Sequence, residues 1–179
     1  MQSVGVIGAG QMGAGIAQVS AQAGYHVYLS DVSLEVAEKA RDVIAHQLAR
    51  LVEKEKLEDQ AMEVAMGRIE PVGDLAPMAT AGLIIEAATE REDIKRQIFE
   101  QVGKILGHDA ILASNTSSIS ITRLAQASTD AARFIGVHFF NPVPLMGLIE
   151  VIRGLATSDD TVERVEKYAT ALGKRTVHA

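Results

Sequence analysis

The sequence predicts an α/β fold of the doubly wound type, a mostly parallel sheet with helices on both faces. Two observations predict it. Apolar segments of strand length alternate with segments of helical periodicity along the first two thirds of the chain, which is the pattern of successive βαβ units. A glycine-rich turn joins the first of these strands to the first helix. Right-handed crossovers then distribute the helices over both faces of one sheet.

The glycine-rich turn lies within Val4 to Ala17, which reads VGVIGAGQMGAGIA. Its glycines, Gly8, Gly10 and Gly13, have the spacing G-x-G-x-x-G between a strand and a helix, the dinucleotide-binding pattern of Rossmann-type sheets. Gly8 allows a tight turn, Gly10 lets a pyrophosphate approach the backbone, and Gly13 lets the helix pack closely on the strand. Gln11 opens that helix, whose free N–H groups and partial positive charge favour phosphates.

An acid is expected at the end of the next strand, and Asp31 occupies that place. The strand covers Tyr25 to Leu29, and Asp31 follows Gly13 at close to the expected spacing of about 20 residues. A carboxylate there accepts hydrogen bonds from the ribose hydroxyls of NAD and would repel the extra phosphate of NADP. The residues after it, Val32 to Leu34, include no Arg to receive that phosphate. The pattern therefore predicts NAD, and it disfavours a glycine-rich turn without a ligand.

Helical periodicity and its punctuation place the helices. Gly24 ends the first helix, and Ser33 is a suitable N-cap for the second, which has Glu35 in its first turn. The charge-dense end of the second helix, Arg50 to Glu58, is interpreted mainly as a solvated face. Helices are expected from Gln11 to Ala23, Leu34 to Lys56, Glu58 to Met66, Glu92 to Leu106 (ended by Gly107), Ile121 to Ala127, and from a cap at Ser158 or Asp159 to Leu172.

Short apolar runs bounded by turn residues place the remaining strands. Leu83 to Glu86 has the apolar character of a buried parallel strand, and Pro142 and Pro144 stop the strand that ends at Phe140. Because an extended segment runs almost to Ala179, we expect residues 1–179 to form one Rossmann domain that a further domain follows. The other strands are expected at Ile69 to Val72, Ala110 to Ala113, Phe134 to Phe140, Leu148 to Ile152 and Arg175 to His178.

Composition excludes several classes of function. The 179-residue chain is 47% hydrophobic and has a net charge of −6, which fits one globular domain with a sizeable core. It has no block of Lys and Arg, so nucleic acid and anionic membranes are disfavoured as partners. Cys is absent, which excludes disulfides and thiolate chemistry. We find neither a signal peptide nor an apolar run of about 20 residues, and we expect a cytoplasmic protein.

The candidate site is formed by the residues that follow the strands. In doubly wound sheets the ligand lies beyond the carboxyl ends of the strands. Polar side chains gather at these places in the sequence. The segments concerned are Gly8 to Gly13, Asp31, Ala88 to Glu90, Ser114 to Ser118, and His138 to Asn141.

His138 is the only histidine in these segments, and its position beside a nicotinamide cleft indicates an acid–base role. Glu150 lies on the following strand, which must run back beside the first because the connecting loop is short. A carboxylate there would orient the imidazole and stabilise its protonated form. A plain edge-strand acid is the weaker alternative, because the neighbours of Glu150 are apolar and a buried acid needs a partner. No residues have the spacing of metal ligands, and no G-x-S-x-G motif occurs.

Four motifs resemble the L-3-hydroxyacyl-CoA dehydrogenase family, including its 3-hydroxybutyryl-CoA form. They are Gly8 to Ala17 (GAGQMGAGIA), Ile85 to Glu90 (IEAATE), Ala113 to Ser118 (ASNTSS) and Val137 to Pro144 (VHFFNPVP). The glycine motif is shared with other dehydrogenases, whereas SNTSS followed by HFFNP is much more specific. The resemblance covers essentially the whole chain.

The resemblance implies NAD-dependent, reversible oxidation of the 3-hydroxyl of an (S)-3-hydroxyacyl-CoA, as in fatty-acid metabolism. His138 would be the base that takes the hydroxyl proton, Glu150 would pair with it, and Ser117 would hydrogen-bond the substrate oxygen and touch the cofactor. The remaining contacts would be Glu90, Lys95 and Asn141 on the nicotinamide half of NAD, and Met12 and Asp31 on the adenosine half.

The resemblance also implies contacts with CoA and a second domain. The long helix after Asp31 would lie near CoA, with Lys54 as a candidate for its phosphates, whereas a family Ser that contacts CoA falls at Gln47 here. Family members continue past a sequence like Gly173–Lys174 into an all-helical domain, which dimerises, closes the cleft and supplies an Asn. The full-length protein is therefore expected to be a homodimer through that domain, and Asn141 and Ser117 are expected to face the substrate.

Two other functions stay open at this point. One is a dehydrogenase of a free 3-hydroxy acid, and the other is a non-catalytic NAD-binding or crystallin-like structural protein. The presence of both His138 and Glu150 argues against the non-catalytic protein. Lys54 and Lys56 favour an acyl-CoA over a free acid.

Overall fold

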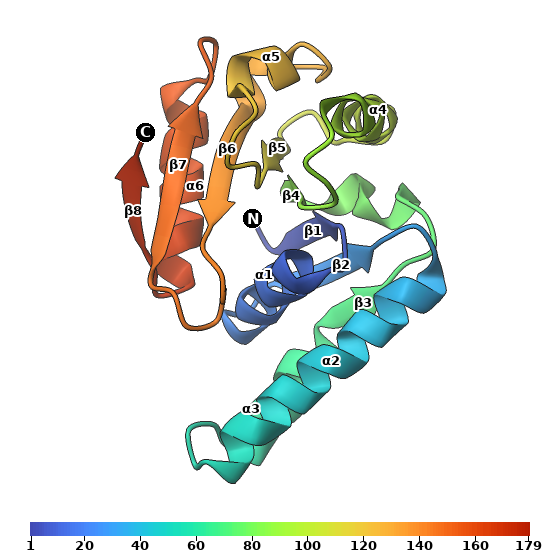
Figure 1. Ribbon diagram of the computed structural model, residues 1–179, viewed down its shortest axis with the longest axis vertical. Helices are drawn as coiled ribbons and strands as arrows, with labels where there is room; N and C mark the ends of the chain where they lie inside the picture. Colours follow the sequence, from blue (N-terminus) through green and yellow to red (C-terminus); the bar gives the residue numbers. More distant parts are fainter.

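The computed structural model describes all residues from Met1 to Ala179. At its centre lies one eight-stranded sheet with the strand order β3-β2-β1-β4-β5-β6-β7-β8 (Figure 1). All neighbouring strands are parallel except β6 and β7, which are antiparallel. The strands are β1 (Ser3–Ile7), β2 (His26–Ser30), β3 (Ile69–Pro71), β4 (Leu83–Glu86), β5 (Ile111–Ser114), β6 (Phe134–Phe139), β7 (Leu148–Arg153) and β8 (Arg175–His178). The predicted mostly parallel sheet is confirmed.

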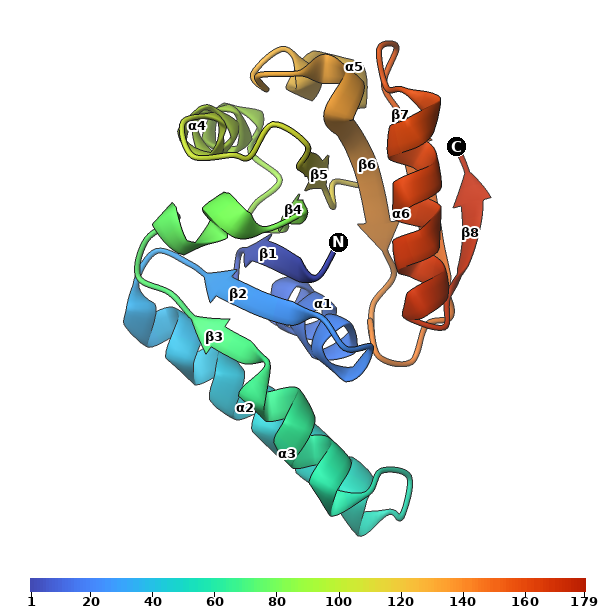
Figure 2. The same cartoon turned by 180° about the vertical axis from the view of Figure 1, so that it is seen from behind.

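Helices cover both faces of this sheet (Figures 1 and 2). The α-helices are α1 (Gln11–Gln22), α2 (Leu34–Glu53), α3 (Asp59–Gly67), α4 (Glu92–Gly103), α5 (Ile121–Ala125) and α6 (Asp159–Ala171). Of two short 3₁₀ helices, η1 (Ala76–Thr80) lies between β3 and β4, and η2 (Ala131–Arg133) lies between α5 and β6. The strand order reverses between β1 and β4, which creates the topological switch point at which doubly wound sheets bind ligands.

Two apolar clusters form the core, one on each face of the sheet. The larger cluster has 29 buried residues and joins the sheet to α1, α2, α3 and α6. The smaller cluster has 12 buried residues and lies under η1, α4 and α5. Successive residues of β4 serve different clusters, because Leu83 and Ile85 belong to the larger one and Ile84 to the smaller one. Since strand side chains alternate between faces, this division confirms the doubly wound arrangement.

Three helices end two or three residues earlier than their sequence patterns predict. Helix α2 ends at Glu53 instead of Lys56, since Glu55 adopts a left-handed conformation (φ 58°) that reverses the chain towards α3. Helix α4 ends at Gly103 instead of Leu106, because the chain tightens into a turn in which amides donate hydrogen bonds to carbonyls three residues earlier. The Lys104 amide, for example, donates to the Gln101 carbonyl. Helix α5 ends at Ala125 instead of Ala127 in the same type of tightened turn.

Helices α2 and α3 form an antiparallel pair that projects from the body of the domain (Figures 1 and 2). The N-cap of α2 is Ser33, whose hydroxyl accepts a hydrogen bond from the Val36 amide, as the sequence predicts. The helix has 20 residues, so its two ends are about 30 Å apart. None of the helices has both the length and the apolar character that a membrane span requires.

Candidate functional site

The glycine-rich turn has two glycines that the fold requires and one that leaves open space. Gly8 has a φ of +106°, and a Cβ there would lie 2.6 Å from the backbone of Ala87. A Cβ on Gly13 would lie 1.6 Å from the carbonyl oxygen of Gly8. Gly10 is exposed, has ordinary backbone angles and has no atom within 4 Å of a Cβ position. The space above Gly10 therefore fits a pyrophosphate at the N-terminus of α1.

Asp31 lies against this turn, at the carboxyl end of β2. One of its carboxylate oxygens accepts a hydrogen bond from the Ala9 amide at 2.6 Å, and the other accepts one from the Val32 amide at 2.6 Å. These two bonds fix the carboxylate beside the open space of the turn. The half-buried acid is thus placed where a ribose of a dinucleotide bound at Gly10 would lie.

A pocket opens beside the turn, between the ends of β1, β4 and β5. Its lining brings together four of the predicted cofactor residues with three others: Met12, Ala87, Ala88, Thr89, Glu90, Lys95 and Asn115. Three of the strand-following segments identified in the sequence contribute to this lining. The carboxyl ends of the central strands therefore form one continuous site with the glycine-rich turn.

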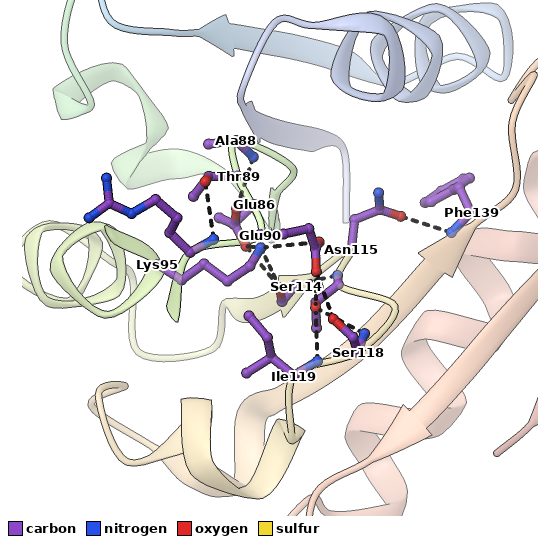
Figure 3. Close-up of polar contacts among 12 residues, drawn as sticks. Glu86, Ala88, Thr89, Glu90, Lys95, Ser114, Asn115, Ser118, Ile119 and Phe139 are labelled. Atoms are coloured by element: carbon purple, nitrogen blue, oxygen red, sulfur yellow. Dashed lines mark hydrogen bonds and ion pairs between the residues drawn. The ribbon is translucent and has the colours of Figure 1, made fainter. Parts of the chain in front are cut away.

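The wall of this pocket rests on a buried ion pair (Figure 3). Lys95 on α4 and Glu86 at the end of β4 are 1% and 0% exposed, and their Nζ and Oε1 atoms are 2.6 Å apart. The same Glu86 oxygen accepts a hydrogen bond from the Ser114 hydroxyl at 2.8 Å, and the other oxygen accepts one from the Ala88 amide at 2.8 Å. Lys95 therefore reaches the pocket from a position that Glu86 fixes.

Glu90 connects this wall to the loop after β5. Its Oε2 atom accepts hydrogen bonds from the hydroxyls of Thr116 at 2.9 Å and Ser118 at 3.1 Å (Figure 3). Its Oε1 atom lies 4.0 Å from the Lys95 ammonium. Between the two hydroxyls lies Ser117, which is exposed. The loop therefore presents Ser117 outwards and uses its neighbours to hold Glu90.

His138 and Glu150 face each other across the antiparallel strands β6 and β7, where they are directly paired in register. The Nδ1 atom of His138 lies 3.5 Å from an oxygen of Glu150, and it is buried without a hydrogen bond. The side chains are 18% and 31% exposed. The sequence prediction that β7 runs back beside β6 and brings Glu150 to the imidazole is confirmed. At this distance the carboxylate forms an ion pair with the imidazole when the ring is protonated.

Two residues hold the backbone around His138. The Asn115 side-chain oxygen accepts a hydrogen bond from the Phe139 amide at 2.8 Å, and so joins β5 to β6 beyond their last paired residues (Figure 3). Lys174 is buried, and its ammonium donates to the carbonyls of Val143 at 2.7 Å and Met146 at 2.5 Å. Burial lowers the pKa of Lys174. The loop that follows His138 is thereby attached to the segment between α6 and β8.

Not all predicted site residues lie together. Lys54 is exposed at the far end of α2, about 30 Å along the helix from the strand ends. Asn141 is exposed in the loop after β6. The sequence prediction did not assign a role to Glu86 or Lys174. Glu86 could have been found, because a lone acid that ends a buried apolar strand requires a partner.

Comparison with known proteins identifies the family. Residues 3–179 match the family model described as "3-hydroxyacyl-CoA dehydrogenase, NAD binding domain". The chain belongs to this family. The expected resemblance is thus confirmed, and the domain is an NAD-binding domain whose glycine turn and Asp31 fit the cofactor. No group of three His, Asp or Glu side chains that could hold a metal ion occurs in the structure.

Relatives of this NAD-binding domain are longer proteins. A probable 3-hydroxybutyryl-CoA dehydrogenase of Deinococcus radiodurans is 52% identical over 170 residues, which is 95% of this chain and 61% of the relative. A 3-hydroxybutyryl-CoA dehydrogenase of Bradyrhizobium diazoefficiens is 49% identical over 175 residues, 98% of this chain and 60% of the relative. The crystal structure of (S)-3-hydroxybutyryl-CoA dehydrogenase from Ralstonia eutropha has a TM-score of 0.97 and 46% identity, and covers 99% of this chain and 63% of that one. The chain spans about three fifths of the length of these relatives.

Proposed function

We propose that the protein carrying this NAD-binding domain oxidises the 3-hydroxyl of an (S)-3-hydroxyacyl-CoA to the 3-ketoacyl-CoA, reversibly and with NAD. The observation that carries the proposal is the His138–Glu150 pair at the end of β6, 3.5 Å apart and beside the NAD-binding edge of the sheet. An acid–base group at that place is what alcohol oxidation by a nicotinamide requires. The relatives named 3-hydroxybutyryl-CoA dehydrogenases support the same substrate class.

The proposed chemistry divides between the cofactor and the chain. When bound, NAD supplies the acceptor for the hydride that leaves C3 of the substrate. His138 takes the hydroxyl proton at Nε2, since its Nδ1 atom is directed to Glu150. Glu150 orients the ring and stabilises its protonated form. Ser117, exposed in the loop after β5, donates a hydrogen bond to the substrate oxygen.

The cofactor contacts are proposed from the same geometry. The amides of the α1 N-terminus, opened by Gly10 and Gln11, hold the pyrophosphate, and Asp31 holds a ribose. Met12 and Ala88 line the pocket beside them. The nicotinamide half lies over the ends of β4 and β5, where Glu90 and Lys95 are proposed contacts, and Asn141 in the loop after β6 is the remaining one.

Lys54 and the wider assembly belong to the full-length protein. We propose that Lys54, at the tip of the projecting α2–α3 pair, contacts the phosphates of CoA. We also propose a cytoplasmic homodimer that is formed through a helical domain after the NAD-binding domain. Both proposals draw support from the family membership and from the greater length of the relatives.

The test uses the full-length protein. The absorbance of NADH at 340 nm is followed with acetoacetyl-CoA, and free acetoacetate and NADPH are run in parallel. Rapid loss of NADH with the thioester alone is the expected result. Activity with the free acid alone would support the 3-hydroxy acid dehydrogenase instead, and tight NAD binding without turnover of any pair would support a non-catalytic protein.

A further inference from the structure

Glu86 is a buried carboxylate that the proposed chemistry does not use. It lies at the last position of β4, its side chain is 0% exposed, and it receives three polar contacts (Figure 3). These contacts come from the Lys95 ammonium at 2.6 Å, the Ser114 hydroxyl at 2.8 Å and the Ala88 amide at 2.8 Å. One carboxylate thus connects β4, β5, α4 and the loop after β4.

A carboxylate in this position holds its partners by charge as well as by hydrogen bonds. The Lys95 ammonium is 1% exposed, so a missing counter-charge would leave it buried and unpaired, which is strongly unfavourable. The other acid near Lys95 is Glu90, whose oxygen is more distant, at 4.0 Å. Glu86 therefore sets where Lys95 lies, and Lys95 in turn faces Glu90 at the pocket wall.

The elements that Glu86 connects lie under one half of the cofactor. In the proposed function, Asp31 at the end of β2 holds the adenosine end, and His138 near the end of β6 marks where hydride transfer takes place. A dinucleotide that reaches from one to the other must lay its nicotinamide half over the ends of β4 and β5. The Glu86 contacts include neither Asp31 nor the open space at Gly10.

We propose that Glu86 is a positioning residue for the nicotinamide half of NAD. It acts through Lys95 and through the Ala88 amide, and it fixes the segment from Ala87 to Glu90 that lines the pocket. The inference rests on NAD binding at this edge of the sheet and is independent of the substrate. Its test therefore measures binding, and a failure of the thioester assay would not affect it.

The test compares NAD with ADP, which lacks the nicotinamide and its ribose. Both are titrated calorimetrically into the full-length protein and into its Glu86→Gln variant, which keeps the size of the side chain and removes its charge. We expect the dissociation constant of NAD to rise at least tenfold and that of ADP to stay within twofold. Equal weakening of NAD and ADP binding would mean that Glu86 only stabilises the fold as a whole, which contradicts the proposal. Unchanged NAD affinity would also overturn it.

Two further variants keep the test informative. Ser114→Ala removes one of the three contacts and keeps the ion pair, so NAD affinity is expected to stay within threefold. A tenfold loss there would assign the effect to a lost hydrogen bond and would contradict the proposal. If Glu86→Gln does not fold, Glu86→Asp keeps the negative charge and shortens its reach to the Lys95 ammonium. In this variant the dissociation constant of NAD is expected to rise at least threefold and that of ADP to stay within twofold, and unchanged NAD affinity would overturn the proposal.

Discussion

Gly10 and Gly13 belong to the same motif, but the structure predicts opposite consequences for adding one methyl group to each. Gly10 is exposed, has φ −74° and ψ −165°, and has no atom within 4 Å of a Cβ position. Gly13 has the Gly8 carbonyl oxygen at 1.6 Å from its Cβ position. Gly10→Ala is therefore expected to weaken ligand binding, and Gly13→Ala is expected to destabilise the fold.

The magnitudes follow from this geometry. In Gly10→Ala, the lower entropy of the unfolded chain favours folding by about 0.4–1 kcal/mol, and the poorer N-cap residue opposes it by about the same amount. The free energy of unfolding is thus expected to change by less than about 1 kcal/mol. In Gly13→Ala, the methyl group must force α1 away from β1, and such overpacking costs about 1–3 kcal/mol or more.

The assay combines urea unfolding with calorimetric titration of NAD. Gly10→Ala is expected to keep the unfolding midpoint and to weaken NAD at least tenfold, about 1.4 kcal/mol, because its methyl group lies where the pyrophosphate approaches. Gly13→Ala serves as the comparison, with a lowered midpoint. Gly10→Ala with NAD affinity within twofold of the unmodified protein would refute the placement of the pyrophosphate above Gly10.

Two other predictions concern cofactor choice and alkaline stability. Asp31→Ala is expected to weaken NAD binding at least tenfold, about 1.4 kcal/mol, and NADP binding much less, because the carboxylate binds the ribose and repels the extra phosphate. The two cofactors are titrated in parallel, and an unchanged affinity for NAD would contradict this role of Asp31. Burial raises the pKa of Tyr168 above its ordinary 10.0, so the folded state keeps a proton that the unfolded state loses, and stability falls above pH 10 by about 1.4 kcal/mol per pH unit. In urea unfolding between pH 9 and 11, the free energy of unfolding should decline less steeply for Tyr168→Phe than for the unmodified protein. This variant also leaves the buried Ser20 hydroxyl without its partner at 2.7 Å, so the slope with pH is compared and not the absolute stability. An equally steep decline would exclude Tyr168 as the source of the pH dependence.

Much of the fold could be predicted because its signals are local in the sequence. The glycine turn, the acid at Asp31 and the order of helices and strands depend on spacings within short segments. The pairing of His138 with Glu150 was also predictable, because the short loop after Asn141 cannot make a crossover and forces β7 to return beside β6. The site residues that local patterns could indicate are therefore those at the strand ends.

The remaining features depend on contacts between distant segments. Lys95 was predicted as a cofactor residue from the resemblance, but no spacing indicates that Glu86 and Ser114 surround its ammonium. The hydrogen bond from the Phe139 amide to the Asn115 side chain takes the place of a backbone hydrogen bond between β5 and β6. Its position depends on where β5 ends. Helix ends were also missed by a few residues, because Glu55 reverses the chain in a left-handed conformation that its residue type rarely adopts.

The most direct test of the proposed reaction is the rate of NADH loss with acetoacetyl-CoA for the full-length protein and its His138→Gln variant. We expect kcat to fall by roughly 10²-fold or more, the scale of a lost general base, while the dissociation constant of NADH stays unchanged. A variant that keeps the full rate would remove His138 from the mechanism and contradict the proposal.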